Sequence, residues 1–160
     1  MYKIILTIIL LAIALLIGRM VFLSLNSRAP DTSLVNGKLR PCPGTPNCVS
    51  SEEQGEPKHL APFSYTSSTE KAWENLQRAI KKSGGVVQKY DNAYLWATYT
   101  TRIFRYVDDM EFRLEPEQKI IHVRSGSRVG KSDLGVNRKN VEKLRKNFET
   151  AQTSPQKFSQ

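Results

Sequence analysis

The sequence has few of the residues from which catalytic and metal centres are most often built. Its 160 residues include two cysteines and two histidines, and His59 and His122 stand alone in the sequence. The spacing of Cys42 and Cys48 is not the C-x2-C spacing of common zinc sites. We therefore expect no metal site and no cofactor, and this scarcity leaves any catalytic residues unknown.

The chain also lacks internal repeats and is too short for two large domains. Of its residues, 39% are hydrophobic and 24% are charged, which suits one small globular domain. We expect a membrane anchor or signal segment over 1–25, a flexible linker over 26–40, a single domain over 41–149 and a disordered tail over 150–160.

Acidic residues are absent from the first 25 residues and scarce in the last 42. Residues 26–118 carry 12 basic and 12 acidic side chains, whereas residues 119–160 carry 10 basic and 3 acidic ones. Such asymmetry indicates an anionic partner, for which we consider anionic lipid, phosphate or an acidic polymer. A basic tail that is merely solvated is the alternative.

One long hydrophobic run is present, at the N-terminus. Residues 4–17 are apolar and follow Lys3, which is the layout of a signal peptide. As a helix this run would rise about 21 Å, but when continued to Leu25 it reaches about 33 Å, enough for a hydrocarbon core of about 30 Å. A cleaved signal peptide and an uncleaved anchor both remain open. We favour an anchor that meets the membrane through residues 4–25, because no A-x-A cleavage site follows.

The cysteine pair agrees with export. Residues 41–48 read PCPGTPNC, and their prolines and glycine can bend the chain so that Cys42 and Cys48 form a disulfide. Two reduced thiols in a cytosolic protein are the alternative. Because the cysteine pair and the N-terminal segment agree, we expect a membrane-anchored domain in the periplasm or an equivalent exported space. Export argues against nucleic acid as a partner.

The remaining patterns predict an α+β domain. A helix is expected from the capping box Ser67-x-x-Glu70 to Gly84, and a second one over 137–149 with Asn137 as its N-cap. Residues 86–90, 94–101, 104–114 and 119–125 are rich in aromatic and β-branched residues and predict strands. We expect an antiparallel sheet of about four strands with two helices packed on one face, preceded by an N-terminal membrane helix.

The last two strands have enough side-chain pattern to predict their register. With a loop at 115–118, one face is apolar and the other pairs opposite charges. The expected facing pairs are Phe112 with Ile121, Met110 with Val123, Asp109 with Arg124, and Glu111 with His122.

The segment after the last strand is only superficially like a P-loop. Gly126 and Gly130 enclose three residues instead of four, and Gly135 would interrupt a helix that began at Lys131. We therefore expect no nucleotide-hydrolysing loop.

Three motifs occur in order along the chain: P-C-P-G-T-P-N-C-V-S-S at 41–51, V-D-D-M-E-F at 107–112 and V-R-S-G-S-R-V-G-K-S-D-L-G-V-N-R at 123–138. Together they closely resemble the bacterial and plastid family known as domain of unknown function 1499, over about residues 40–148. The resemblance implies no particular activity. It marks as family-pattern positions Cys42, Cys48, Asp108, Asp109, Glu111, Arg124, Ser125, Ser127, Arg128, Gly130, Asp133, Gly135, Asn137 and Arg138.

The polar segment 124–138 is our candidate binding site. Its cations, hydroxyl groups and glycine-freed backbone N–H groups are those that bind anions. The expected anion-binding residues are Arg124, Ser125, Ser127, Arg128, Lys131 and Arg138. The expected supporting polar network is Asp108, Asp109, Glu111, His122, Asp133 and Asn137.

Other interpretations of these residues stay open. The arginines and carboxylates can pair in a buried network that only fixes the loop, so that the domain is purely structural or serves interactions. The three carboxylates of 108–111 could, less favourably, bind a hard cation. A small hydrolase-like enzyme would need Ser125 or Ser127 as nucleophile and His122 or Asp133 as base, yet no G-x-S-x-G elbow is present. We favour a non-catalytic module that binds an anionic or polar ligand.

Overall fold

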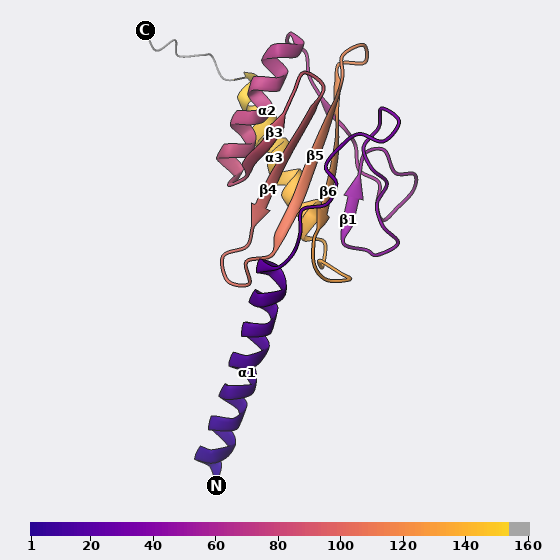
Figure 1. The fold of residues 1–160 in the computed structure, drawn as a ribbon. Helices are drawn as coiled ribbons and strands as arrows, with labels where there is room; N and C mark the ends of the chain where they lie inside the picture. Colours follow the sequence, from indigo (N-terminus) through magenta and orange to yellow (C-terminus); the bar gives the residue numbers. More distant parts are fainter. Residues whose placement is uncertain (154–160) are drawn as a thin grey trace.

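A computed structural model describes residues 1–153 of the chain, and it has a long N-terminal helix followed by an α+β domain (Figure 1). The elements are α1 (Tyr2–Leu25), β1 (Cys48–Ser50), β2 (Phe63–Ser64), α2 (Thr69–Ser83), β3 (Val86–Tyr90), β4 (Tyr94–Thr100), β5 (Val107–Glu115), β6 (Ile120–Ser127) and α3 (Val136–Thr153). The α+β prediction is confirmed. The sheet has six strands instead of about four.

All strand pairs in the sheet are antiparallel. The strand order is β1-β6-β5-β4-β3, and β2 also pairs with β6. The two strands that the sequence did not predict, β1 and β2, have three and two residues, which is too short for an alternating pattern. They extend the sheet beyond the hairpin that carries the candidate site.

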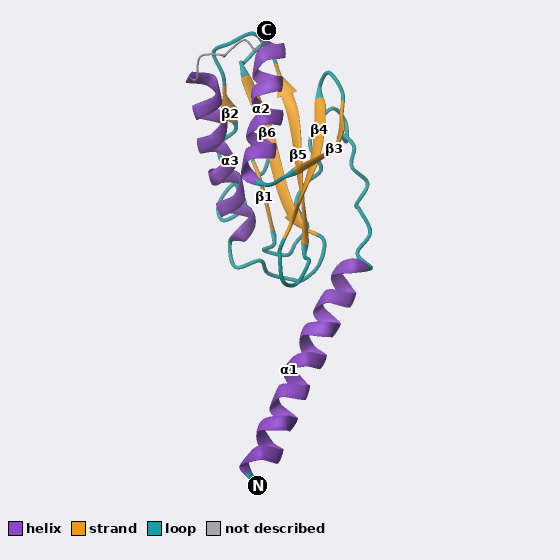
Figure 2. Cartoon of the chain, turned by 90° about the vertical axis from the view of Figure 1, so that its left-hand side faces the viewer, coloured by secondary structure: helices purple, strands orange, loops and turns teal. Residues whose placement is uncertain are grey.

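Helices α2 and α3 pack side by side on one face of the sheet (Figure 2). The apolar side chains of α3 are buried there, with Phe148 against Phe63 at 5.6 Å between ring centroids. The opposite face of α3 is exposed and carries Lys139, Lys143 and Lys146. The other face of the sheet is left for the polar residues described below.

The helix ends differ from the predictions by a few residues. Ser68, not Ser67, caps α2 by accepting a hydrogen bond from the Lys71 backbone N–H. Asn137 lies inside the first turn of α3, because the carboxylate of Asp133 accepts from the Asn137 backbone N–H at 2.6 Å and takes the capping role. Helix α3 also continues through residues 150–153 of the expected disordered tail, and the rest of that tail lies outside the described residues.

The predicted register of the β5–β6 hairpin is wrong by two residues. Phe112 pairs with Val123 and Glu111 with Arg124, while Asp109 lies opposite Gly126. The loop is 116–119, because Glu115 stays in the strand and Lys119 takes the left-handed backbone conformation (φ 55°) that the turn needs. An even shift preserves the faces, so the predicted core side chains are buried: Met110, Phe112, Ile121 and Val123.

The end of the expected linker packs on the domain. Leu39 is buried, and its backbone N–H donates to the Glu52 carboxylate at 2.6 Å. Arg40 donates to Glu111 at 2.7 Å. The domain therefore begins before residue 41, and two residues of the linker prediction are corrected.

Helix α1 leaves the domain as a single straight rod (Figure 1). Its 24 residues rise about 36 Å, which is long enough to cross a hydrocarbon core of about 30 Å. Among the described residues it is the one helix long and apolar enough to do so, although a signal sequence has the same features. The expected N-terminal apolar helix is therefore present.

Candidate functional site

The sheet divides the predicted polar residues into two groups. Side chains alternate along a strand, so Asp109 and Glu111 of β5 point to the face opposite that of Met110, which lies between them. We call this face, on which neither α2 nor α3 packs, the open face. Arg124 of β6 lies across from Glu111 on it, whereas Ser125 points to the face that carries α2 and α3. The predicted anion site is therefore not one continuous cluster.

Glu111 is the centre of the open-face network. Its carboxylate is completely buried and accepts hydrogen bonds from Arg40 at 2.7 Å, from Arg124 at 2.9 Å and from the Tyr94 hydroxyl at 2.8 Å. Burial raises the pKa of Tyr94, and the negative charge of Glu111 raises it further. Two guanidinium groups thus share one buried carboxylate.

Asp109 holds the third arginine of the network. Arg128 donates from Nε and Nη2 to the two carboxylate oxygens of Asp109, at 2.8 and 2.7 Å. The Trp96 indole N–H donates to the same carboxylate at 2.8 Å. This bidentate pair fixes the orientation of the Arg128 guanidinium.

Arg124 differs from Arg128 because one of its buried donors has no partner. Arg124 is 7% exposed, and its Nε, like the Nε of Arg40, finds no hydrogen-bond partner within residues 1–153. Burial lowers the pKa of Arg124, and the charge of Glu111 opposes that change. Buried polar groups are nearly always satisfied, so a spare N–H here calls for an explanation.

Arg124 lines a cavity of ≈ 180 Å³ at the end of the sheet where β5 begins. Arg28, Arg128, Ser127 and Asp109 also line it, so three cationic side chains face one carboxylate. Arg28 is exposed and has no ion pair or side-chain hydrogen bond with any residue that the structure describes. The cavity is therefore electropositive.

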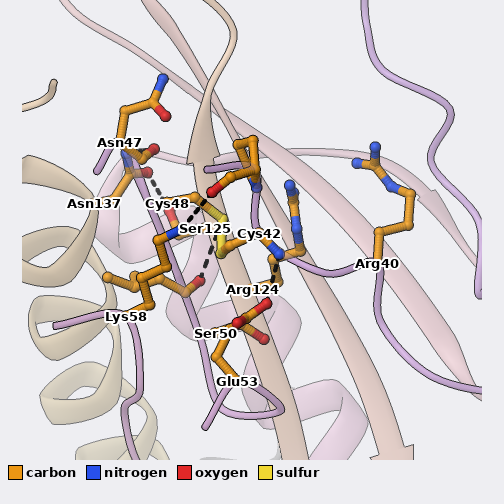
Figure 3. Close-up of a disulfide and its surroundings, with 12 residues drawn as sticks. Arg40, Cys42, Asn47, Cys48, Ser50, Glu53, Lys58, Arg124, Ser125 and Asn137 are labelled. Atoms are coloured by element: carbon orange, nitrogen blue, oxygen red, sulfur yellow. Dashed lines mark hydrogen bonds between the residues drawn. A yellow bond between two sulfur atoms is a disulfide. The ribbon is translucent and has the colours of Figure 1, made fainter. Parts of the chain in front are cut away.

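The disulfide predicted from the cysteine pair is present and borders this cavity. Cys42 and Cys48 are bonded, with an S–S distance of 2.03 Å, and Arg124 lies beside them (Figure 3). The Asn47 side chain donates to the Gly130 carbonyl at 2.7 Å, and Cys48 lines the cavity. The disulfide loop thus forms part of the cavity wall.

The second polar group lies on the helix face. Asn137 is completely buried, accepts from the Ser125 hydroxyl at 2.6 Å and donates to the Asn47 carbonyl at 3.0 Å. Ser127 donates to Asp108 at 2.5 Å. Burial raises the pKa of Asp108, although the hydrogen bond from Ser127 opposes the shift. These contacts join the start of α3 to β6 and to the disulfide loop.

Three of the six expected anion-binding residues do not reach the cavity. Ser125 is bonded to Asn137, and Lys131 is exposed. Arg138 donates to the backbone carbonyls of Pro57 and His59, both at 2.7 Å, and so holds α3 to the segment before β2. The structure brings together Arg124, Ser127 and Arg128.

The serines do not form a nucleophile–base pair with the histidine. His122 contacts the Ser51 hydroxyl at 3.1 Å on the open face, and burial lowers its pKa. Ser125 points to the other face and donates to Asn137. Within residues 1–153, no three His, Cys, Asp or Glu side chains come together in a way that could hold a metal ion.

Several residues of the site were missed in the sequence. Alternation along β4 could have placed Tyr94 and Trp96 beside the carboxylates of β5, but we used these aromatic residues only to predict a strand. Arg28 and Arg40 lie in the segment that we took for a linker, where no periodic pattern connects them with the sheet.

These observations define the class of protein. It is an α+β domain behind an N-terminal apolar helix, with a disulfide and a buried arginine–carboxylate network on the open face of its sheet. A family model described as protein of unknown function (DUF1499) matches residues 38–148. The chain therefore belongs to this family, the one that its motifs resemble. No curated protein and no solved structure matches the chain.

Proposed function

We propose that this protein is a membrane-anchored, non-catalytic binding domain whose cavity takes a small anionic group. The observation that carries the proposal is the spare Nε–H of the buried Arg124 beside an electropositive cavity. An anion in the cavity would accept from this donor and from Arg28, which has no partner among the described residues. Hydrogen bonds between charged groups are the stronger kind.

The local charge balance supports an anionic ligand. Arg40, Arg124 and Arg128 bring three positive charges to the network, and Glu111 and Asp109 bring two negative ones. Arg28 adds a further positive charge at the cavity. The carboxylates hold the guanidinium groups in place before a ligand arrives, which lowers the cost of ordering them on binding.

The size of the cavity restricts the ligand. Its ≈ 180 Å³ is less than the roughly 300–1,000 Å³ of sites for drug-sized molecules. It therefore suits one phosphate or carboxylate group. The phosphate can belong to a lipid headgroup or be free.

Location is the other part of the proposal. The apolar helix supports anchoring in a membrane, and the disulfide supports an oxidising space. We place the domain in the periplasm or an equivalent exported space, with α1 as an uncleaved anchor.

The alternative to ligand binding is a purely structural role for the arginine–carboxylate network. The buried bidentate contact between Arg128 and Asp109 favours this alternative.

Calorimetric titration of the protein with inorganic phosphate tests the binding proposal. Arg28→Gln should weaken phosphate binding about tenfold, since a hydrogen bond to a charged group contributes about 1.5 kcal/mol or more. The thermal midpoint should not change, because Arg28 has no partner within residues 1–153. Lys89→Gln, on an exposed side chain of β3, is the matched control and should bind normally.

The same titration with a soluble short-chain phosphatidylglycerol distinguishes the two sources of phosphate. Binding of the lipid with no binding of inorganic phosphate would identify a headgroup site. If the wild type binds neither, or if Arg28→Gln binds both as well as the wild type does, the proposed ligand site is wrong and the structural role stands.

A further inference from the structure

Two loops leave the sheet at the same end. Residues 101–106 connect β4 with β5, and residues 128–135 follow β6. Because β5 and β6 are antiparallel and Asp108 lies opposite Ser127, the loop before β5 and the loop after β6 are neighbours. The Arg128 backbone N–H donates to the Val107 carbonyl at 3.1 Å and joins them. Both loops lie at the end of the domain that is nearest α1 (Figure 1).

The end of α1 is in contact with one of these loops. The Ser24 hydroxyl, in the last turn of α1, donates to the backbone carbonyl of Arg105. Ser24 is 2% exposed, although the helix around it is open to its surroundings. A bilayer crossed by α1 would therefore end close to the two loops.

Each loop presents an apolar side chain among cations. Ile103 is 71% exposed and Leu134 is 87% exposed, which is unusual for large apolar residues of a domain with a well-formed core. Arg102, Arg105 and Lys131 are exposed around them. The one acidic residue in the two loops, Asp133, is engaged in capping α3.

We propose that these two loops dock the domain on the anionic surface of the bilayer that α1 spans. Ile103 and Leu134 enter the headgroup region, and Arg102, Arg105 and Lys131 face the acidic lipids. The inference rests on the anchoring part of the proposed function and is independent of the anion cavity. Docking holds the open face and its cavity at a fixed distance from the lipid surface.

Lipid quenching of site-specific dyes tests the docking. The full chain is reconstituted in vesicles of phosphatidylcholine, alone or mixed equally with phosphatidylglycerol, that contain a headgroup-level quencher lipid. Single cysteines replace Ile103, Leu134, Tyr90 or Ile9 and carry the dye, while the native cysteines stay bonded to each other. Tyr90 is exposed at the opposite end of the sheet and is the matched control, and Ile9 reports on α1.

We expect strong quenching at Ile103 and Leu134 in the mixed vesicles, weaker quenching in phosphatidylcholine, and little at Tyr90. The double change Arg102→Glu with Lys131→Glu should reduce the quenching at both loops to the level of Tyr90. Its thermal midpoint should equal that of the wild type, because neither side chain has an ion pair in the described part of the chain. Lys89→Glu should have no effect.

The other outcomes distinguish the anchoring of α1 in the bilayer from the docking of the two loops on its surface. The dye at Ile9 is tested in separate vesicles whose quencher lies at acyl depth. If this dye is quenched but the quenching at Ile103 and Leu134 only equals that at Tyr90, anchoring holds and docking is wrong. If the dye at Ile9 is not quenched either, both claims fail. Quenching at the loops that is equal in both vesicles and survives the charge reversals would overturn the attraction to anionic lipid.

Discussion

Arg124 and Arg128 lie on the same face and carry the same charge, but they use their donors differently. Arg128 places two donors on Asp109, whereas Arg124 shares Glu111 with Arg40 and keeps its Nε–H unused. Arg40 and Arg124 each keep a buried Nε–H without a partner, but Arg124 lines the cavity beside Asp109, whereas Arg40 lines another cavity. We infer that Arg128 positions the site and that Arg124 offers its unused donor to a ligand.

The substitution Arg128→Glu should destabilise the domain. It would place a second negative charge beside Asp109, whose side chain is 2% exposed, and breaking a buried ion pair costs about 3–5 kcal/mol. Denaturant unfolding measures the change, with the exposed Lys89→Glu as control. A free energy of unfolding equal to that of the wild type would mean that the pair does not hold this end of the sheet together.

Asp108 gives a prediction for the pH dependence of stability. Burial raises its pKa in the folded protein above the usual 3.8, so the folded state binds the proton more tightly than the unfolded state. Between these two pKa values the free energy of unfolding falls as the pH rises, and above the folded pKa the charged carboxylate remains unfavourable. Asp108→Asn keeps an acceptor for Ser127 and should be more stable than the wild type at neutral pH.

This advantage should disappear as the pH falls through the folded pKa of Asp108, because the wild-type carboxyl then becomes neutral as well. Thermal unfolding of both proteins over the acidic range measures the difference. A variant that is less stable than the wild type at neutral pH would show that the charge of Asp108 stabilises the domain.

At the scale of elements, the β5–β6 hairpin joins the core to the site. Phe112→Ala should lower the free energy of unfolding by about 3–5 kcal/mol, because the ring is completely buried and packs against Phe63 at 6.2 Å between centroids. Val86→Ala, at an exposed position, is the control and should cost far less. A loss below about 1 kcal/mol for Phe112→Ala would contradict the packing of this face.

The hairpin also explains how far the sequence could predict the site. Alternation has a period of two residues, so it placed Glu111 and Arg124 on the polar face whichever even register was chosen. The partner of each residue depends on the loop, and the left-handed turn at Lys119 was not visible in the sequence. The faces were therefore predicted correctly, and the ion pairs were not.

Contacts that depend on tertiary structure were beyond the sequence. Arg40 reaches Glu111 across 71 positions of the chain, and nothing local to a proline-flanked segment indicates such a partner. In the same way Asn137 looked like a helix cap, while its side chain serves to join α3 with β6. The family motif at 123–138 pointed to the right segment and gave no partners.

At the scale of the whole molecule, the disulfide connects location with stability. Cys42→Ser with Cys48→Ser should lower the free energy of unfolding by about 2–3 kcal/mol, the chain-entropy value for so short a loop. In freshly isolated cells, thiol alkylation without reductant should label neither cysteine of the wild type. Ready labelling of both would contradict an oxidising location.

The whole account depends on a ligand reaching the unused donor of Arg124, and one measurement observes that donor directly. The Nε–H resonances of the arginines are followed by NMR while inorganic phosphate is added at constant ionic strength, with chloride as the control anion. We predict that the Arg124 Nε–H signal shifts and saturates with phosphate, while that of Arg128, already bonded to Asp109, moves much less. An Arg124 signal that stays unchanged up to high phosphate concentration would contradict the account and leave the arginines with a purely structural role.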